Sequence, residues 1–307
     1  MAQALDLDQK VQPSNAGDAE QIRELIADAQ RFSDTEDRFR FLANHFIERA
    51  TPYSREMLMP DLPAGVIRVD LSSFDCGSFV HFLVALTCAR DIETFLWVLK
   101  TSRYRRGRVS AKNLLHFLNN NVSQMIEAQI AVDVTSELAP PNTIRTRTVK
   151  LGIKSNGEPF FDLHRRNEFW EANGEFSGGD RNVGQAVTMN YLCRSAVAEV
   201  EPLLQCGDVV YLTSSQDPQE FPELFNHSAL VYKFDDCPEK AFLIHSSLTE
   251  WSVVREEQGG VCIARFPRWT REARLSMNRY SQLHEYLEAY RRHFDGVVVL
   301  RLIPFLD

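Results

Sequence analysis

The segment that most constrains the fold has an acidic residue and a cysteine immediately before a long apolar run. Asp75 carries a side chain that favours a helix N-cap, and the residues from Phe79 to Leu86 are nearly all apolar. This pattern predicts a helix that begins at Cys76, ends near Ala89 and is largely buried. We therefore expect the rest of the chain to be organised around this helix.

Cys76 falls in the first turn of the predicted helix. Free backbone N–H groups and the positive end of the helix dipole favour a thiolate at such a position, so Cys76 is a candidate nucleophile that needs a base. Most free cysteines, however, pack as small apolar residues. A purely structural role for Cys76 is therefore the alternative at this point.

Composition narrows the class of protein. The chain has 307 residues, 44% of them hydrophobic and 25% charged, which is ordinary for a soluble globular protein of one large domain or one domain with an appendage. The formal net charge of -8 gives no basic surface for nucleic acid. Six cysteines without a C-x-x-C pair argue against a cysteine-based metal site and against a disulfide framework.

No apolar stretch is long enough to cross a bilayer, so we expect no membrane span. Residues 1–17 are polar and lack the apolar segment of a secretory signal. The sequence thus predicts a cytoplasmic protein, or one exported by a route that uses no such signal.

The first half of the chain has the patterns of helices. Two amphipathic helices are expected between Asp18 and Ala50, with a break near Ser33, and we predict that residues 1–55 form a polar leader and helical appendage to a main domain of residues 56–307. Further predicted helical segments are Ile92–Lys100 after an Asp91 cap, Leu114–Leu118 and Asp162–Trp170, followed by a loop at 173–184.

The last third of the chain is rich in candidate strands. Together with two earlier ones, they are Val66–Val69, Thr148–Gly152, Val209–Leu212, Ser228–Phe234, Ala241–Ile244, Ser252–Val254 and Gly296–Ile303. A helix is expected at Tyr280–His293, between the last two. A helical front half and a strand-rich back half predict an α+β fold.

Two of the eight histidines, His227 and His245, lie at the ends of predicted strands that flank a turn near Asp236. An antiparallel hairpin centred there brings the two imidazoles face to face at its open end, whereas a one-residue slip separates them. Two alternatives are a pair of structural surface histidines and a metal site. No Asp or Glu follows the same pattern at a strand end.

Five short blocks, in this order, resemble the NlpC-type, papain-like cell-wall cysteine hydrolases, and most closely their N-acetylmuramoyl-L-alanine amidase-like branch. The blocks are Asp75–Val80, the basic run Arg103-Tyr104-Arg105-Arg106-Gly107, Cys206–Val210, Asn226–Leu230 and Leu243–Ser247. The resemblance extends from about residue 70 to 303 and leaves residues 1–55 uncovered.

The resemblance implies that Cys76 is the nucleophile, that His227 is the base and that His245 orients it. It implies that the backbone N–H of Cys76 helps to hold the oxyanion. The substrate is then an amide of peptidoglycan or of a muropeptide fragment, and no metal or organic cofactor takes part. The remaining side chains that we assign to substrate binding are Arg103, Tyr104 and Asp75.

The sequence departs from the family pattern in places. Gly77 and Ser78 replace the usual residues after the cysteine, and Ala229 stands where a glycine is usual. Because of these changes, the sequence does not identify which amide bond is cleaved. Two other classes are also compatible with the sequence: an acyltransferase or transglutaminase-like enzyme, and a non-catalytic binding protein on a degenerate hydrolase fold.

Overall fold

The fold comes from a computed structural model, in which the described residues are 11–13, 18–49, 51–54, 67–110, 113–115, 118–157, 184–247, 260–265 and 280–304. Three expected segments fall outside these ranges: the helix Asp162–Trp170, nearly all of the loop at 173–184 and the strand Ser252–Val254.

Helix α3 (Cys76–Cys88) forms the buried centre that the sequence predicts. Ser78 N donates to Asp75 Oδ1 at 2.6 Å and Asp75 N donates to Ser78 Oγ at 3.0 Å, which closes a capping box at its start. Every residue from Ser78 to Cys88 is buried. Helix α4 (Ile92–Arg103) follows, with Asp91 as its predicted N-cap, and ends at Arg103 rather than Lys100.

The two predicted N-terminal helices are present and pack against α3. They are α1 (Asp18–Ala29) and α2 (Thr35–Glu48), and Asp34 caps the second at the expected break. Phe46 of α2 makes edge-to-face contacts with Phe74, Phe79 and Phe82 at centroid distances of 5.7, 6.0 and 5.9 Å. These helices therefore share one hydrophobic core with α3, while the predicted domain boundary at residue 55 stays a prediction.

Smaller elements surround this helical layer. Strand β1 (Val11–Pro13) pairs in parallel with β2 (Ile67–Val69). Helix α5 spans Leu118–Glu127, so the short helical piece expected at Leu114–Leu118 is wrong: Leu114 instead forms a β-bridge with Tyr104. The remaining helical turns are η2 (Arg105–Gly107), α6 (Thr135–Leu138), η4 (Arg194–Ala196), α8 (Val197–Val200) and η5 (Glu201–Leu203). No described helix is both long and apolar enough to cross a membrane.

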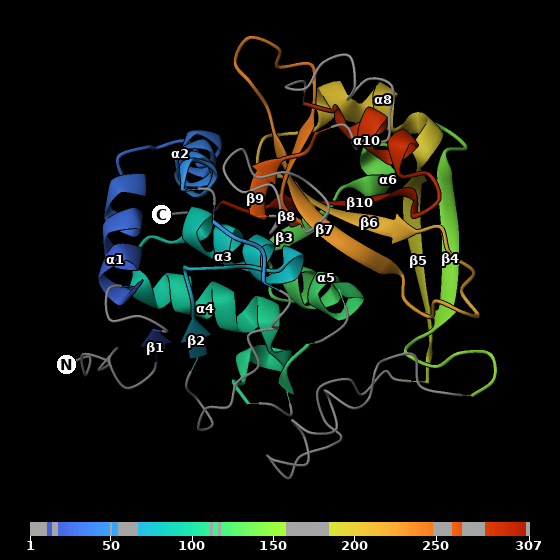
Figure 1. The fold of residues 1–307 in the computed structure, drawn as a ribbon, viewed down its shortest axis with the longest axis horizontal. Helices are drawn as coiled ribbons and strands as arrows, with labels where there is room; N and C mark the ends of the chain where they lie inside the picture. The colour runs from blue at the N-terminus through green and yellow to red at the C-terminus, as the bar shows by residue number, and fades with distance from the viewer. Residues whose placement is uncertain are drawn as a thin grey trace.

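One antiparallel sheet contains the strands of the second half. Its order is β4-β5-β10-β6-β7-β8-β9, with β3 also paired to β10. The bounds are β3 Ala131–Asp133, β4 Ile144–Lys150, β5 Ala186–Cys193, β6 Val209–Ser214, β7 Phe225–Tyr232, β8 Phe242–Ser247, β9 Gly260–Ile263 and β10 Phe294–Leu302. The expected mixed fold, with helices first and an antiparallel sheet after, is confirmed (Figure 1).

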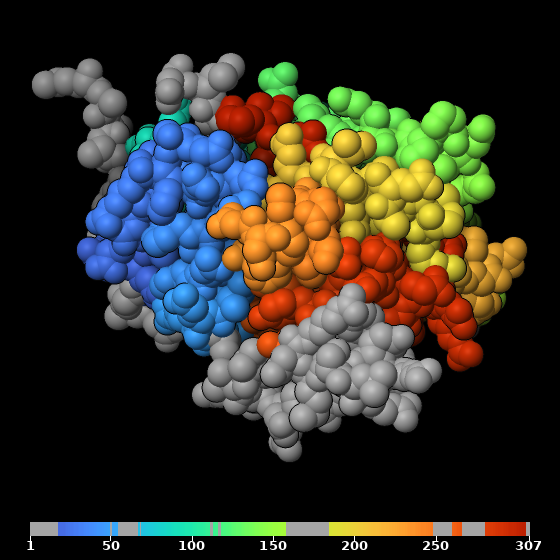
Figure 2. Space-filling view, turned by 90° about the horizontal axis from the view of Figure 1, so that it is seen from above, coloured from blue at the N-terminus to red at the C-terminus, as the bar shows by residue number. Residues whose placement is uncertain are grey.

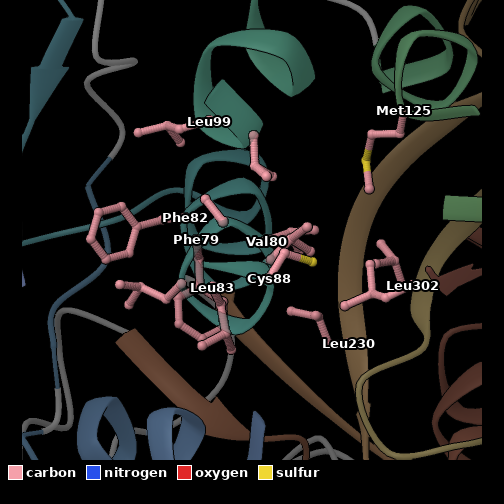
Figure 3. Close-up of a cluster of buried hydrophobic side chains, with 14 of the residues drawn as sticks. Phe79, Val80, Phe82, Leu83, Cys88, Leu99, Met125, Leu230 and Leu302 are labelled. Atoms are coloured by element: carbon pink, nitrogen blue, oxygen red, sulfur yellow. The ribbon is translucent and has the colours of Figure 1, made fainter. Parts of the chain in front are cut away.

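The sheet is covered on both faces. Leu230 and Ile244 belong to the core that contains α3, and Figure 3 shows Leu230 of β7, Leu99 of α4 and Met125 of α5 around that helix. The alternate residues, such as Ala229 and Leu243, pack with α8 and α10 (Leu283–Ala289). Because neighbouring strand residues point to opposite faces, β7 supplies side chains to both layers.

Helix α10 is shorter than the expected Tyr280–His293. Tyr280 forms a β-bridge with Arg265, and Gln282 caps the helix through a capping box with Glu285. The helix ends at Ala289 because Tyr290 leaves helical geometry.

The β7–β8 hairpin has the expected strands with a shifted register. Leu230 pairs with Ile244, Val231 with Leu243 and Tyr232 with Phe242, so the hairpin is centred on Cys237 and not on Asp236. Two successive turns, at 234–237 and 237–240, set this connection. The partner of each residue moves by two positions, which preserves the face to which each side chain points.

Contacts between α2 and this hairpin fix the N-terminal helices to the sheet. Arg40 forms an ion pair with Asp235, and Tyr232 Oη donates to Asn44 Oδ1 at 2.8 Å. Figure 2 shows the blue N-terminal helices lying directly against the orange hairpin.

Gly207 and Asp208, which immediately precede β6, have a structural role. Arg301 of β10 donates to both carboxylate oxygens of Asp208, at 3.0 and 2.9 Å, and Gln205 N donates to the same group at 2.8 Å. Gly207 has a φ of 92°, and a Cβ there would lie 3.3 Å from Phe39 Cγ. This block of the sequence therefore joins β6, β10 and α2.

Candidate active site

Cys76 is the first residue of α3 and remains partly exposed. Its thiol faces Ser228 of β7, which directs both a backbone N–H and a hydroxyl at the sulfur. Tyr211 of β6, the register partner of Ser228, lies close enough for the cysteine to influence its phenol electrostatically. The start of α3 thus meets the sheet at the junction of β6 and β7.

The resting thiol differs from the thiolate that its helix position predicts. Burial first, and the neighbouring Asp75 carboxylate second, raise the pKa of Cys76 to about 12. Hydrogen bonds from Ser228 and Gly77 act in the opposite direction but do not compensate. Desolvation therefore opposes the effect of the helix terminus, which favours the thiolate, while the role of Cys76 as the nucleophile stays a prediction.

The two candidate histidines lie together as expected. His227 Nε2 and His245 Nδ1 are 2.7 Å apart, and the ring centroids are separated by 4.9 Å. His245 is fully buried, whereas His227 is partly exposed. Burial lowers the pKa of His227 well below its ordinary value, and proximity to His245 lowers it further. The hydrogen bond thus joins His245 to a neutral His227.

This hydrogen bond restricts how His227 can act. With Nε2 engaged by His245, Nδ1 is the nitrogen left to accept a proton from a thiol. Within the described residues, Cys76 Sγ makes no hydrogen bond to the His227 ring; it contacts the next residue along the strand. The cysteine and the base therefore flank the same short stretch of β7 without being joined in the resting state.

Aromatic rings from the other layer support the imidazoles. Tyr286 of α10 lies edge-on to His245 at 5.7 Å, and Phe294 of β10 lies 6.4 Å from His227. These contacts fix the planes of both rings in a largely apolar setting. A separation of 2.7 Å is a hydrogen-bond distance, shorter than the roughly 3.3 Å between two nitrogens that ligate one tetrahedral zinc ion. The geometry of these two nitrogens thus favours the dyad over the metal-site alternative.

Of the three predicted substrate-binding residues, one lies beside the thiol and two are buried at the end of α4. Asp75 caps α3 beside the thiol. Arg103 ends α4 and is only 9% exposed, and Tyr104 is 1% exposed, so the first two residues of the basic run are buried. Arg103 instead acts on buried His81, whose pKa falls to about 3 through burial first and the positive guanidinium second. The role of Arg103 and Tyr104 in substrate binding stays a prediction from the resemblance, and packing of α4 makes both residues interior.

Sequence reasoning missed Ser228 and Tyr211. The only available signal was position, since Ser228 directly follows the predicted base. Its contact with the thiol depends on how α3 meets β7, and no residue pattern encodes that angle.

Comparisons with known proteins agree with this architecture. The family model AmiA-like, described as N-acetylmuramoyl-L-alanine amidase-like, matches residues 42–258, a range that includes Cys76, His227 and His245. No curated protein sequence matches the chain.

Several solved structures share the fold at low identity. A Legionella pneumophila protein has a TM-score of 0.65 at 14% identity, with 93% of this chain and 94% of that chain covered. An N-acetylmuramoyl-L-alanine amidase from Bacteroides uniformis has a TM-score of 0.59 at 17% identity, covering 88% and 99%. A Bacteroides fragilis protein provisionally named a xylanase has a TM-score of 0.60 at 18% identity, covering 85% and 99%.

Proposed function

Because this chain belongs to the N-acetylmuramoyl-L-alanine amidase-like family, we propose that it is a cysteine hydrolase that cleaves an amide bond in peptidoglycan or in muropeptides. The observation that carries the proposal is the 2.7 Å His227–His245 hydrogen bond on the strand that contacts the Cys76 thiol. A cysteine at a helix start beside a histidine on an antiparallel sheet resembles the NlpC-type, papain-like arrangement, which we propose for this site.

The first half of the proposed reaction is acyl transfer to Cys76. The thiol proton moves to His227 Nδ1 as the sulfur attacks the amide carbonyl, so a neutral thiol and a neutral imidazole suffice at the start. The backbone N–H of Cys76, at the start of α3, is aimed to donate to the developing oxyanion. His227 then gives its proton to the leaving nitrogen, the C–N bond breaks and a thioester remains.

Water completes the cycle. His227 Nδ1 takes a proton from the water that attacks the thioester, the C–S bond breaks and the proton returns to the sulfur. Throughout, His227 Nε2–H donates to His245 Nδ1, which fixes the tautomer and shares the positive charge that forms on His227. His245 therefore has the orienting role in this scheme.

The first bond to test is the one in the family description, between N-acetylmuramic acid and L-alanine. Purified protein is incubated with a defined muropeptide, and the products are identified by mass spectrometry. We expect addition of one water across a single amide bond, activity lost in Cys76→Ser and in His227→Ala, and partial activity in His245→Asn, because an amide oxygen can also accept from Nε2. Cleavage that persists in Cys76→Ser would contradict the proposal.

A second candidate is a non-catalytic muropeptide-binding protein. The high thiol pKa of about 12 and the lack of a resting thiol–imidazole hydrogen bond among the described residues favour it specifically. It predicts that muropeptides bind with no bond cleaved and that Cys76→Ser leaves their affinity unchanged. Titration calorimetry with the same muropeptide separates this outcome from hydrolysis.

A further inference from the structure

Ser228 is a buried polar residue that the family resemblance leaves without a role. Its side chain is fully buried, with 0% exposure, on the central strand β7. Its hydroxyl makes no hydrogen bond of normal geometry to any described residue, but it lies beside the Cys76 thiol and acts to lower the pKa of that thiol. A buried hydroxyl without a stable hydrogen-bond partner lowers the stability of the folded protein. The position of the Ser228 hydroxyl beside the Cys76 sulfur therefore suggests a functional role.

The alternation of β7 accounts for the placement. His227 lies beside Phe294 of β10, and the next residue, Ser228, lies beside Cys76 at the start of α3. Two adjacent residues of β7 thus flank the proposed reaction centre, one with the base and the other with donors to the sulfur. The backbone N–H of Ser228 is directed at the same sulfur, so this residue offers two donors.

We propose that Ser228 is a thiolate-stabilising residue, whose hydroxyl donates a hydrogen bond to Cys76 Sγ as that sulfur becomes negative. Hydrogen bonds to a charged group are stronger than those to a neutral one, so this donor acts mainly after the proton has left. In an apolar setting with a raised thiol pKa, such a donor reduces the cost of forming the thiolate. The other titratable groups that face the sulfur are Asp75 on its own segment and Tyr211 from β6.

The assignment rests on the proposed role of Cys76, but it is tested on the thiol directly and without a peptidoglycan substrate. Full-length protein is alkylated with iodoacetamide from pH 7 to 10, and mass mapping follows the rate at each cysteine. Iodoacetamide is neutral, and the thiolate displaces iodide, so the rate at a fixed pH reports the thiolate fraction. We expect Ser228→Ala to slow Cys76 alkylation about tenfold at every pH, equivalent to one pKa unit.

Three controls separate this role from a structural one. Thr213→Val removes another buried hydroxyl that has no hydrogen-bond partner among the described residues, one strand away on β6, and should leave the Cys76 rate unchanged. Ser228→Thr keeps the hydroxyl and should restore the rate to within threefold. The partly exposed Cys193 and Cys237 should react at wild-type rates in every variant, which shows that the fold is intact.

A Cys76 rate in Ser228→Ala that is within threefold of wild type, or faster, overturns the assignment. An absence of hydrolysis by the wild-type protein refutes the proposed function instead and leaves this measurement valid. The two failures are therefore distinguishable.

Discussion

The two ends of helix α3 carry the same residue in different surroundings. Cys76 begins the helix and Cys88 ends it, and burial raises the pKa of both thiols to about 12. Cys88 lies in the apolar cluster, labelled in Figure 3, where the Arg38 guanidinium acts to lower its pKa. Cys76 lies beside Ser228, which offers two donors and directly follows His227 on β7.

The comparison shows that neither residue type nor burial selects the nucleophile. The two cysteines differ in helix terminus, since free N–H groups surround the first and free carbonyl groups the second. They differ more in tertiary neighbours, because only the start of α3 meets the sheet where β7 carries the histidine. The proposed chemistry therefore depends on a junction between two elements and not on the helix alone.

The largest difference between the two cysteines is expected when each is replaced by alanine in a separate variant. Cys76→Ala should reduce kcat/KM for muropeptide hydrolysis by about 10³-fold or more, because the acyl-enzyme cannot form. Cys88→Ala should leave kcat/KM within twofold and lower the free energy of unfolding by about 1 kcal/mol, because it removes only packing. Steady-state kinetics and urea unfolding measure both quantities, and comparable activity losses in the two variants would remove the basis of the comparison.

His81 lies between the two cysteines on α3 and tests whether the interior around this helix excludes charge. Its pKa is about 3 in the folded protein and about 6.5 when unfolded, so between these values the unfolded chain binds a proton that the folded chain excludes. Folding stability should therefore fall as the pH drops below 6.5, by about 1.4 kcal/mol per pH unit from this residue.

The measurement is urea unfolding of wild type and His81→Gln between pH 7 and 4.5. The variant lacks the titrating ring, so its stability should fall less steeply over this range. His227 also has a lowered pKa and supplies a residual slope in both proteins. Parallel curves for the two proteins would show that the His81 ring is protonated or solvated in the folded state.

The smallest expected effect concerns the charge beside Cys76. Asp75→Asn keeps an oxygen to cap α3 and removes a carboxylate that raises the thiol pKa, so Cys76 alkylation should become about threefold faster. Asp91→Asn makes the same change at the cap of α4 and should leave the Cys76 rate as it is. Cys88 should respond to neither variant, and an equal response to both would point to a general change in stability.

Local chemistry in the sequence determined much of the fold. Caps and apolar periodicity located α1, α2, α3 and α4, because these signals act within one or two helical turns. The hairpin pattern located β7 and β8 and brought His227 to His245, although the ladder is shifted by two residues. That error did not separate the rings because a shift of two preserves the face of each side chain.

Tertiary structure alone decided what surrounds the reactive groups. The sequence contains Arg103 and Tyr104 in a basic run, yet packing of α4 buries both. A helix start favours a thiolate, yet desolvation holds the Cys76 thiol neutral, and Ser228 becomes its neighbour only through the angle at which α3 meets β7. Solvation and contact depend on atoms distant in the chain, so no local pattern specifies them, whereas caps and alternation depend on atoms a few residues apart.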